Sequence, residues 1–89
     1  MLNANADSIS LKVLFFGAAG DAVGTKEMLL DAPAPSNVED VKQILFSNYA
    51  ALAELSRSLM IAVNEQYATD DTVLNNGDTV AFLPPVSGG

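Results

Sequence analysis

The sequence contains no cysteine, no histidine and no tryptophan, and only four of its 89 residues are basic. Without cysteine and histidine, the chain can form no disulfide, thiolate metal site, thiol nucleophile, imidazole base or Ser-His triad. Long apolar runs are absent too, since none approaches the roughly 20 residues that a membrane-spanning helix needs. The first residues, MLNANADS, lack the basic region and apolar segment of a secretory signal. We therefore expect no membrane insertion and, by default, a cytoplasmic protein.

The shortage of basic residues makes the chain strongly acidic. Eleven acidic residues against four basic ones give a formal net charge of -7 at pH 7. Such a surface repels phosphate backbones, so nucleic-acid binding is disfavoured. A basic protein surface would be attracted instead. The plainer interpretation, that the acidity serves solubility alone, stays open.

Length and composition predict a single folded domain. A chain of this size buries about 60 to 65% of its unfolded surface. Apolar residues make up 49% of the sequence, which is enough to fill one core. An enclosed catalytic cleft would have little room in such a domain.

The first third of the chain has the pattern of a hairpin. We expect residues 1–7, which are small and polar, to form a flexible extension. Ser8–Phe16 alternates between apolar and other residues and predicts a strand, whereas residues 17–24 predict a loop. Thr25–Asp31 predicts the returning strand, ended by the prolines that follow it. The apolar face of the first strand contains Ile9, Leu11, Val13 and Phe15.

A helix is predicted after the hairpin. Ser36 and Glu39 have the spacing of a capping box, which marks a helix start. Apolar residues then recur at helical spacing and indicate a helix from about Asn37 to Tyr49. Residues 50–58 fit either a turn or a short second helix. The recurring apolar residues are Val38, Val41, Ile44, Leu45 and Tyr49.

The last third predicts three further strands. Residues 59–63 form a short apolar strand in the sheet interior, residues 64–68 a small edge strand, and residues 78–83 the final strand after an Asn76-Gly77 turn. This order of elements predicts an α+β fold over residues 8–83, with a mixed sheet wrapped around one main helix. That is the ubiquitin-like β-grasp arrangement, in which the first and last strands lie side by side at the sheet centre.

The end of the sequence carries the clearest functional pattern. Two prolines directly after a strand favour a stiff, extended course, and the glycines at the tip have no side chains. A stiff base with a slender tip suits insertion into a narrow pocket of another protein. The competing interpretation is a frayed end without a role. The tail consists of Pro84, Pro85, Val86, Ser87, Gly88 and Gly89.

The reactive group of this tail would be the carboxylate of Gly89, because no side chain near it can act as acid, base or nucleophile. A carboxylate is a poor electrophile at neutral pH until ATP converts it to an acyl-adenylate. A sulfur donor can then displace AMP and leave a thiocarboxylate. With no cysteine in the chain, any sulfur that this protein carries could not reside on a side-chain thiol.

From Ile9 to Gly89 the chain resembles the small, sulfur-carrying subunit of molybdopterin synthase. The most specific segment is NGDTVAFLPPVSGG, residues 76–89, which combines a Gly-Asp turn, an apolar strand and a Pro-Pro-Val-x-Gly-Gly end. The other segments that carry the resemblance are KVLFFGAAGDAVGT (residues 12–25) and IAVNEQYA (residues 61–68). One departure is that Gly20 and Asp21 stand where many relatives have Arg and Glu, which puts partner contacts through that arginine in question.

The resemblance implies a set of partners and a reaction. An adenylating enzyme would activate Gly89 with ATP, and a sulfurtransferase relay would form the thiocarboxylate. The loaded carrier would insert its tail into the large synthase subunit, in a heterotetramer, and give its sulfur to cyclic pyranopterin monophosphate to build the molybdopterin dithiolene. In this scheme the chain is a sulfur-donating subunit with no active site and no bound cofactor of its own.

The sequence also suggests where the partner would dock. Phe16 and Leu83 are expected on the sheet face opposite the core, beside the root of the tail, and Tyr67 on the edge strand could join them. An apolar patch of this kind is typical of a docking site. The alternative is that these three are ordinary core residues or scattered surface groups.

The sequence leaves three other functions open. The chain could be a protein modifier joined to lysines through Gly89, a sulfur carrier of thiamine synthesis, or a binding module with an inert end. Thiamine carriers are generally shorter and lack the Pro-Pro-Val stalk. Two acidic pairs, Asp70-Asp71 and Glu39-Asp40, could suggest a metal site, but they fit a turn and a helix start better, so we expect no metal.

Overall fold

The computed structural model describes residues 8–84, which hold the complete sheet and its helices. Two sequence predictions, the flexible extension at residues 1–7 and the tail from Pro85 to Gly89, lie outside these residues. Pro84, the first residue of the tail, is described and is exposed.

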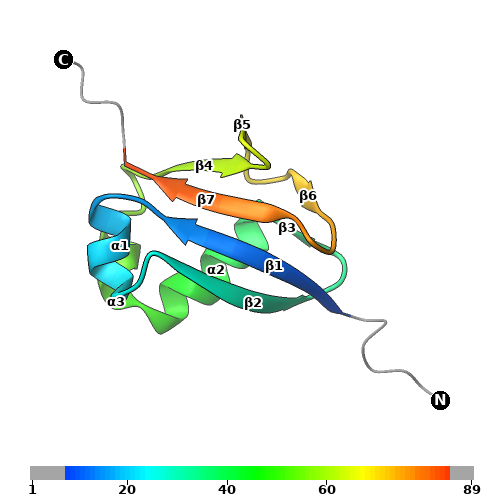
Figure 1. Ribbon diagram of the computed structural model, residues 1–89, viewed down its shortest axis with the longest axis horizontal. Coiled ribbons are helices and arrows are strands. Elements are labelled where there is room, and N and C mark those ends of the chain that lie inside the picture. The colour runs from blue at the N-terminus through cyan, green and yellow to red at the C-terminus, as the bar shows by residue number, and fades with distance from the viewer. Residues whose placement is uncertain (1–7, 85–89) are drawn as a thin grey trace.

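Ten elements make up the described part of the chain. Five strands form a mixed sheet in the order β2-β1-β7-β4-β5, and a separate two-stranded sheet pairs β3 with β6. The predicted α+β fold of the β-grasp type is confirmed, with α2 lying across one face of the main sheet (Figure 1). The elements are β1 (Ser8–Phe15), α1 (Ala18–Val23), β2 (Glu27–Pro33), β3 (Ser36–Asn37), α2 (Val38–Asn48), α3 (Ala50–Glu54), β4 (Met60–Val63), β5 (Gln66–Tyr67), β6 (Val73–Leu74) and β7 (Thr79–Leu83).

The first and last long strands, β1 and β7, lie side by side, as the sequence predicts. They pair in parallel, so that Val13 lies opposite Val80 and Phe15 opposite Phe82. β7 also pairs with β4 on its other side, antiparallel, which makes β7 the middle strand of five. The end of the chain is therefore held at the centre of the sheet.

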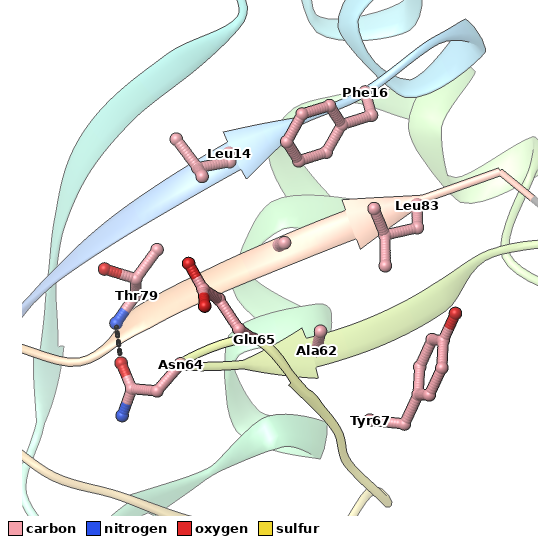
Figure 2. Close-up of a pocket in the computed structure, with 9 residues that line it drawn as sticks. Leu14, Phe16, Ala62, Asn64, Glu65, Tyr67, Thr79 and Leu83 are labelled. Carbon is pink, nitrogen blue, oxygen red and sulfur yellow. Dashed lines mark hydrogen bonds between the residues drawn. The ribbon is translucent and has the colours of Figure 1, made fainter.

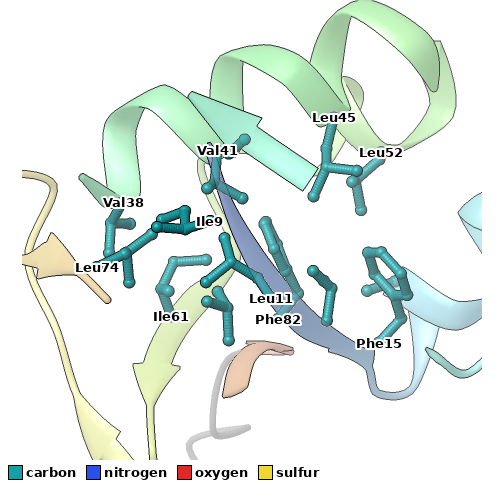
Figure 3. Packing of buried hydrophobic residues seen from close by; sticks show 14 residues of the cluster. Ile9, Leu11, Phe15, Val38, Val41, Leu45, Leu52, Ile61, Leu74 and Phe82 are labelled. Carbon is teal, nitrogen blue, oxygen red and sulfur yellow. The ribbon is translucent and has the colours of Figure 1, made fainter. Parts of the chain in front are cut away.

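The core forms between this sheet and α2. Alternate residues of β1 and β7 are buried, and they meet the face of α2 that carries Val38, Val41 and Leu45 (Figure 3). The Phe82 ring stacks on Phe15 with centroids 5.6 Å apart, and the ring of Phe46 approaches it edge-on at 6.5 Å. Burial of these side chains is the main stabilising term, because each removes a large apolar surface from water.

The helix start differs from the sequence prediction by one residue. Asn37, not Ser36, is the N-cap of α2: its side chain accepts from the Asp40 backbone N–H, and the Asp40 carboxylate accepts from the Asn37 N–H, each at 2.9 Å. Glu39 therefore has no part in the capping box. Ser36 is buried instead, and its hydroxyl donates to the Pro33 carbonyl. The Ser-x-x-Glu spacing and the Asn-x-x-Asp spacing overlap here, and the burial of Ser36 decides between them.

Two other segments differ from expectation, and a third resolves an open choice. Residues 18–23, predicted as loop, form the helix α1, which presents Ala19 to the core. β2 begins two residues later than predicted and runs to Pro33; a proline is tolerated there because β2 is an edge strand. In the stretch after α2, for which the sequence left a turn and a short second helix open, the structure has the short helix α3, which buries Leu52.

Candidate functional site: an apolar sheet face beside the root of the tail

The outer face of the main sheet carries a row of apolar side chains. By strand register, Leu14 on β1 lies opposite Ala81 on β7, Ala81 opposite Ala62 on β4, and Ala62 opposite Tyr67 on β5. Within residues 8–84 no helix crosses this face, since α2 covers the opposite one (Figure 1). Along a strand with one face open to water, the residues on that face are normally polar, so an apolar row here is unusual.

A shallow groove of about 560 Å³ runs along this row. Phe16, Tyr67 and Leu83, the three residues predicted for docking, all line it (Figure 2). Phe16 is 46% exposed and Tyr67 68% exposed, whereas Leu83 is half-buried. The structure thus brings the three together on one surface and excludes Phe16 and Tyr67 from the core. Their role in binding a partner stays a prediction.

The root of the tail is fixed beside this groove. The Phe16 N–H donates to the Phe82 carbonyl at 3.0 Å, which extends the β1–β7 pairing to the end of β7. Gly17 then turns the chain away with a φ of +56° and packs against Pro84, whose Cγ would lie 3.1 Å from a Cβ at this position. The role of Gly17 cannot be predicted from the sequence, because a glycine in a glycine-rich segment gives no sign of what packs against it.

We expect Gly17→Ala to destabilise the fold and to displace the root of the tail. A left-handed conformation costs a non-glycine residue about 1–2 kcal/mol, and the added methyl would press on the Pro84 ring. The midpoint of thermal unfolding, followed by circular dichroism, should fall by roughly 10 °C.

Gly24→Ala is the comparison for that change. Gly24 also has a positive φ, +90°, but its ψ of 9° places it in the αL region, whereas Gly17 has a ψ of -130°. Nothing lies within 4 Å of a Cβ at Gly24, so this variant carries a milder backbone strain and no contact. If Gly17→Ala is no less stable than Gly24→Ala, Pro84 does not rest on Gly17 in the way described.

The residues that replace the usual Arg and Glu lie in α1. Gly20 is half-buried, and a Cβ at this position would stand 3.1 Å from the Phe15 carbonyl oxygen, so a larger residue needs the helix to shift slightly. Asp21 is exposed in the first turn of the helix. Neither Gly20 nor Asp21 lines the apolar groove. Both instead border a second hollow, between α1 and the start of β2.

The acidic pairs have structural partners. Asp40 caps α2, Glu39 accepts a hydrogen bond from the Gln43 side chain, and Asp70 pairs with Lys42 at 2.8 Å. The hydroxyl of Thr69 donates to Asp71 at 2.6 Å and lowers the pKa of that carboxyl. Among residues 8–84, no three side chains of the metal-binding types gather into one group.

The groove is lined mainly by apolar side chains. Its lining contains one carboxylate, Glu65, and one phenol, Tyr67, among otherwise apolar or amide and hydroxyl side chains. The sequence contains no histidine or cysteine.

None of the helices within residues 8–84 has the length and apolar character that a membrane span requires.

Comparison with known proteins gives consistent matches. Residues 13–89 match the ThiS family. A molybdopterin synthase sulfur carrier subunit from Caenorhabditis elegans is 39% identical over 83 residues, covering 91% of this chain and 99% of the relative. A chain in the complex of subunits 1 and 2 of the molybdopterin-converting factor from Helicobacter pylori aligns with a TM-score of 0.69 at 27% identity, covering 91% of this chain and all of that one.

A protein named for a different function has the same fold. The solution structure of small archaeal modifier protein 1 from Methanosarcina acetivorans aligns with a TM-score of 0.78 at 28% identity, covering 92% of this chain and 98% of that one. The fold is thus shared between proteins named as sulfur carriers and proteins named as modifiers.

Proposed function

Since this chain belongs to the ThiS family, together with the molybdopterin synthase sulfur carrier subunits, we propose that it carries sulfur on the carboxyl group of Gly89. The observation that carries the proposal is the position of the tail root. β7 ends at Leu83, on the rim of an exposed apolar groove, and the tail continues from there through Pro84. A partner that covers the groove would receive the tail at the same time.

The chemistry follows from the groups that the chain has. The Gly89 carboxylate would attack the α-phosphorus of ATP on an adenylating enzyme, forming an acyl-adenylate and releasing pyrophosphate. A sulfur donor would then form a carbon–sulfur bond at that carbonyl, while the carbon–oxygen bond to AMP breaks. ATP is consumed by the activating enzyme in this scheme, and the carrier itself holds no cofactor.

The loaded tail would act inside the large subunit of molybdopterin synthase. The thiocarboxylate sulfur would bond to a carbon of cyclic pyranopterin monophosphate as a carbon–oxygen bond at that carbon breaks and the oxygen leaves. Water would then cleave the bond between the sulfur and the Gly89 acyl carbon and restore the carboxylate. One carrier delivers one sulfur, and a dithiolene needs two, so spent carriers must exchange for loaded ones. We propose a heterotetramer of two carriers and two large subunits, acting in the cytoplasm.

The similarity to a two-subunit complex supports the choice of partner. The Helicobacter pylori structure is titled as a complex of subunits 1 and 2 of the molybdopterin-converting factor, and a chain of it has the fold described here. The groove and its exposed Phe16 supply an apolar centre of the kind found in such interfaces.

Intact mass spectrometry tests the carrier chemistry directly. After incubation with ATP, the adenylating enzyme and a sulfur source, the chain should gain the mass difference between sulfur and oxygen, located by fragmentation at Gly89. The same incubation without ATP is the control and should leave the mass unchanged. A chain that keeps its original mass with all components present would contradict the proposal.

A second function has one specific observation in its favour. The likeness to small archaeal modifier protein 1 allows Gly89 to be joined to lysine amines of target proteins. Immunoblots of cell extracts would then show a ladder of higher-mass conjugates that disappears when Gly89 is removed. The two functions share the acyl-adenylate and differ only in the nucleophile that accepts the acyl group.

A further inference from the structure

The turn between β4 and β5 contains a residue in an unfavourable conformation. Val63 pairs with Gln66, so Asn64 and Glu65 form a two-residue hairpin loop. Both have positive φ, +51° for Asn64 and +72° for Glu65, as a type I′ turn requires. Asparagine is common in such a turn, whereas its second position normally holds glycine, because a Cβ is strained there. Glu65 therefore occupies a position that glycine would occupy more stably.

The turn is held in this conformation by Asn64. Its backbone N–H donates to the Thr79 carbonyl at 2.8 Å, and its side-chain oxygen accepts from the Thr79 N–H at 3.0 Å. Its side-chain nitrogen donates to Asp78 at 3.0 Å. These three bonds tie the hairpin to the start of β7, so the turn does not need the Glu65 side chain for its shape.

The Glu65 side chain makes no contact that would stabilise the described fold. Within residues 8–84 its carboxylate has no hydrogen bond and no ion pair, and the side chain is exposed. Lys12, the basic residue of β1 on this sheet face, pairs with Glu27 of β2 instead. Its Nζ lies 4.0 Å from a carboxylate oxygen of Glu27, on the side of β1 that faces away from β7. Strained residues that do not stabilise the fold are found most often at functional sites, so the position of Glu65 on the surface matters.

Glu65 lies on such a surface. It lines the apolar groove, and Figure 2 shows its carboxylate directed from the hairpin toward β7. It is the one carboxylate among the groove residues, while Asn64 and Thr79 already bond to each other. A partner that buries the groove would bury this charge as well, which is favourable only if the partner supplies an opposite charge.

We infer that Glu65 is the charged recognition group of the groove and pairs with an arginine or lysine side chain of the partner that docks there. The inference rests on the proposed function, which makes that partner the large subunit of the synthase. The net charge of -7 draws basic surfaces to the whole molecule, and Glu65 fixes where one basic group must lie. The strain at Glu65 is then the cost of placing a carboxylate at the groove.

Three variants separate recognition from stability. Glu65→Gln removes the charge and keeps the strained backbone, whereas Glu65→Gly removes both. Glu54→Gln, at the exposed end of α3 and outside the groove, is the matched control because it makes the same change in net charge. Affinity for the large subunit from the same organism is measured by calorimetry at low and high salt, and unfolding by circular dichroism.

We expect Glu65→Gln to bind about 10-fold more weakly at low salt and to show a smaller dependence on salt, whereas Glu54→Gln should change affinity less than about 2-fold. Glu65→Gly should bind at least as weakly as Glu65→Gln, yet unfold about 4–8 °C higher because the strain is gone. Opposite effects on affinity and stability are not expected of a residue with a merely structural role.

Two results would overturn the inference. One is equal affinity of Glu65→Gln and Glu54→Gln for the large subunit; if the wild-type chain takes up sulfur in the same preparation, the proposed function survives that result. The other is a wild-type chain that neither takes up sulfur nor binds the large subunit, in which case the proposed function falls together with the inference.

Discussion

A chain that lacks Gly88 and Gly89 will donate no sulfur. The deletion removes the carboxylate from the end of the slender tip and leaves it on Ser87, which has a side chain and lies two residues closer to the domain. The adenylating site and the synthase site must both approach the carbonyl closely, so activation should fail at the first step. We expect no mass gain with ATP and sulfur source, and no molybdopterin formed with the large subunit.

The same variant should keep its fold and its docking. Every described strand and helix lies within residues 8–83, so circular dichroism and the unfolding midpoint should match the full chain. The truncated chain should also compete with the full chain for the large subunit, because the groove is intact. Normal molybdopterin synthesis with the truncated chain would mean that the working group is not at Gly89.

Replacing Phe16 with Arg should greatly weaken binding of the large subunit. Phe16 is 46% exposed at the end of β1, and it lines the groove beside the tail root. A charged side chain there would be buried against an apolar partner surface without a counter-charge. Loss of a central aromatic anchor costs about 2–4 kcal/mol, so affinity should fall by roughly 30- to 1000-fold. Leu83→Arg should have a similar effect from the neighbouring strand.

Val73→Arg is the control for that experiment. Val73 is 63% exposed on β6, in the small separate sheet, and it does not line the groove. The same gain of charge at this site should leave affinity unchanged. All three variants should fold, because none of the three positions is buried in the core. Undiminished affinity in Phe16→Arg, measured by calorimetry, would show that the partner binds elsewhere.

The strands of the sheet could be predicted because their side chains alternate. Burial of Ile9, Leu11, Val13 and Phe15 on one face left Phe16 on the other, and the parallel pairing of β1 with β7 carried Leu83 to the same surface. The placement of the three expected groove residues therefore followed from period-two patterning together with the β-grasp topology. Their role as partner contacts is a prediction that binding experiments must decide.

The helix α1 could not be predicted from local sequence. Its residues, AAGDAV, include a glycine, and its N-cap Gly17 offers no side chain to bond the first N–H groups. What stabilises it is tertiary: Ala19 is completely buried against the core, and Gly24 ends the helix in a left-handed conformation. Short helices of this kind depend on packing more than on propensity.

The turn between β4 and β5 could not be predicted either, because its sequence is not the one that this type of turn favours. An Asn-Gly pair announces a type I′ turn, and the chain has one at Asn76-Gly77, where a turn was expected. At residues 64 and 65 the pair is Asn-Glu, which carries no such indication, and the sequence predicts a small strand over residues 64–68 instead of a turn. The departure from the favoured sequence is the same property that marks Glu65 as a recognition residue.

The central position of β7 makes the completion of the fold depend on the completion of synthesis. β7 lies between β1 and β4, so without it the main sheet separates into one pair, β2 with β1, and another, β4 with β5. Because β7 is the last of the described strands to be synthesised, the main sheet cannot close until β7 has left the ribosome, and contacts between segments so distant in the chain form slowly. A chain whose synthesis stops before β7 therefore lacks Ala81 of the apolar row and the tail root at Pro84, so only a completed and folded domain presents the groove and the tail root together.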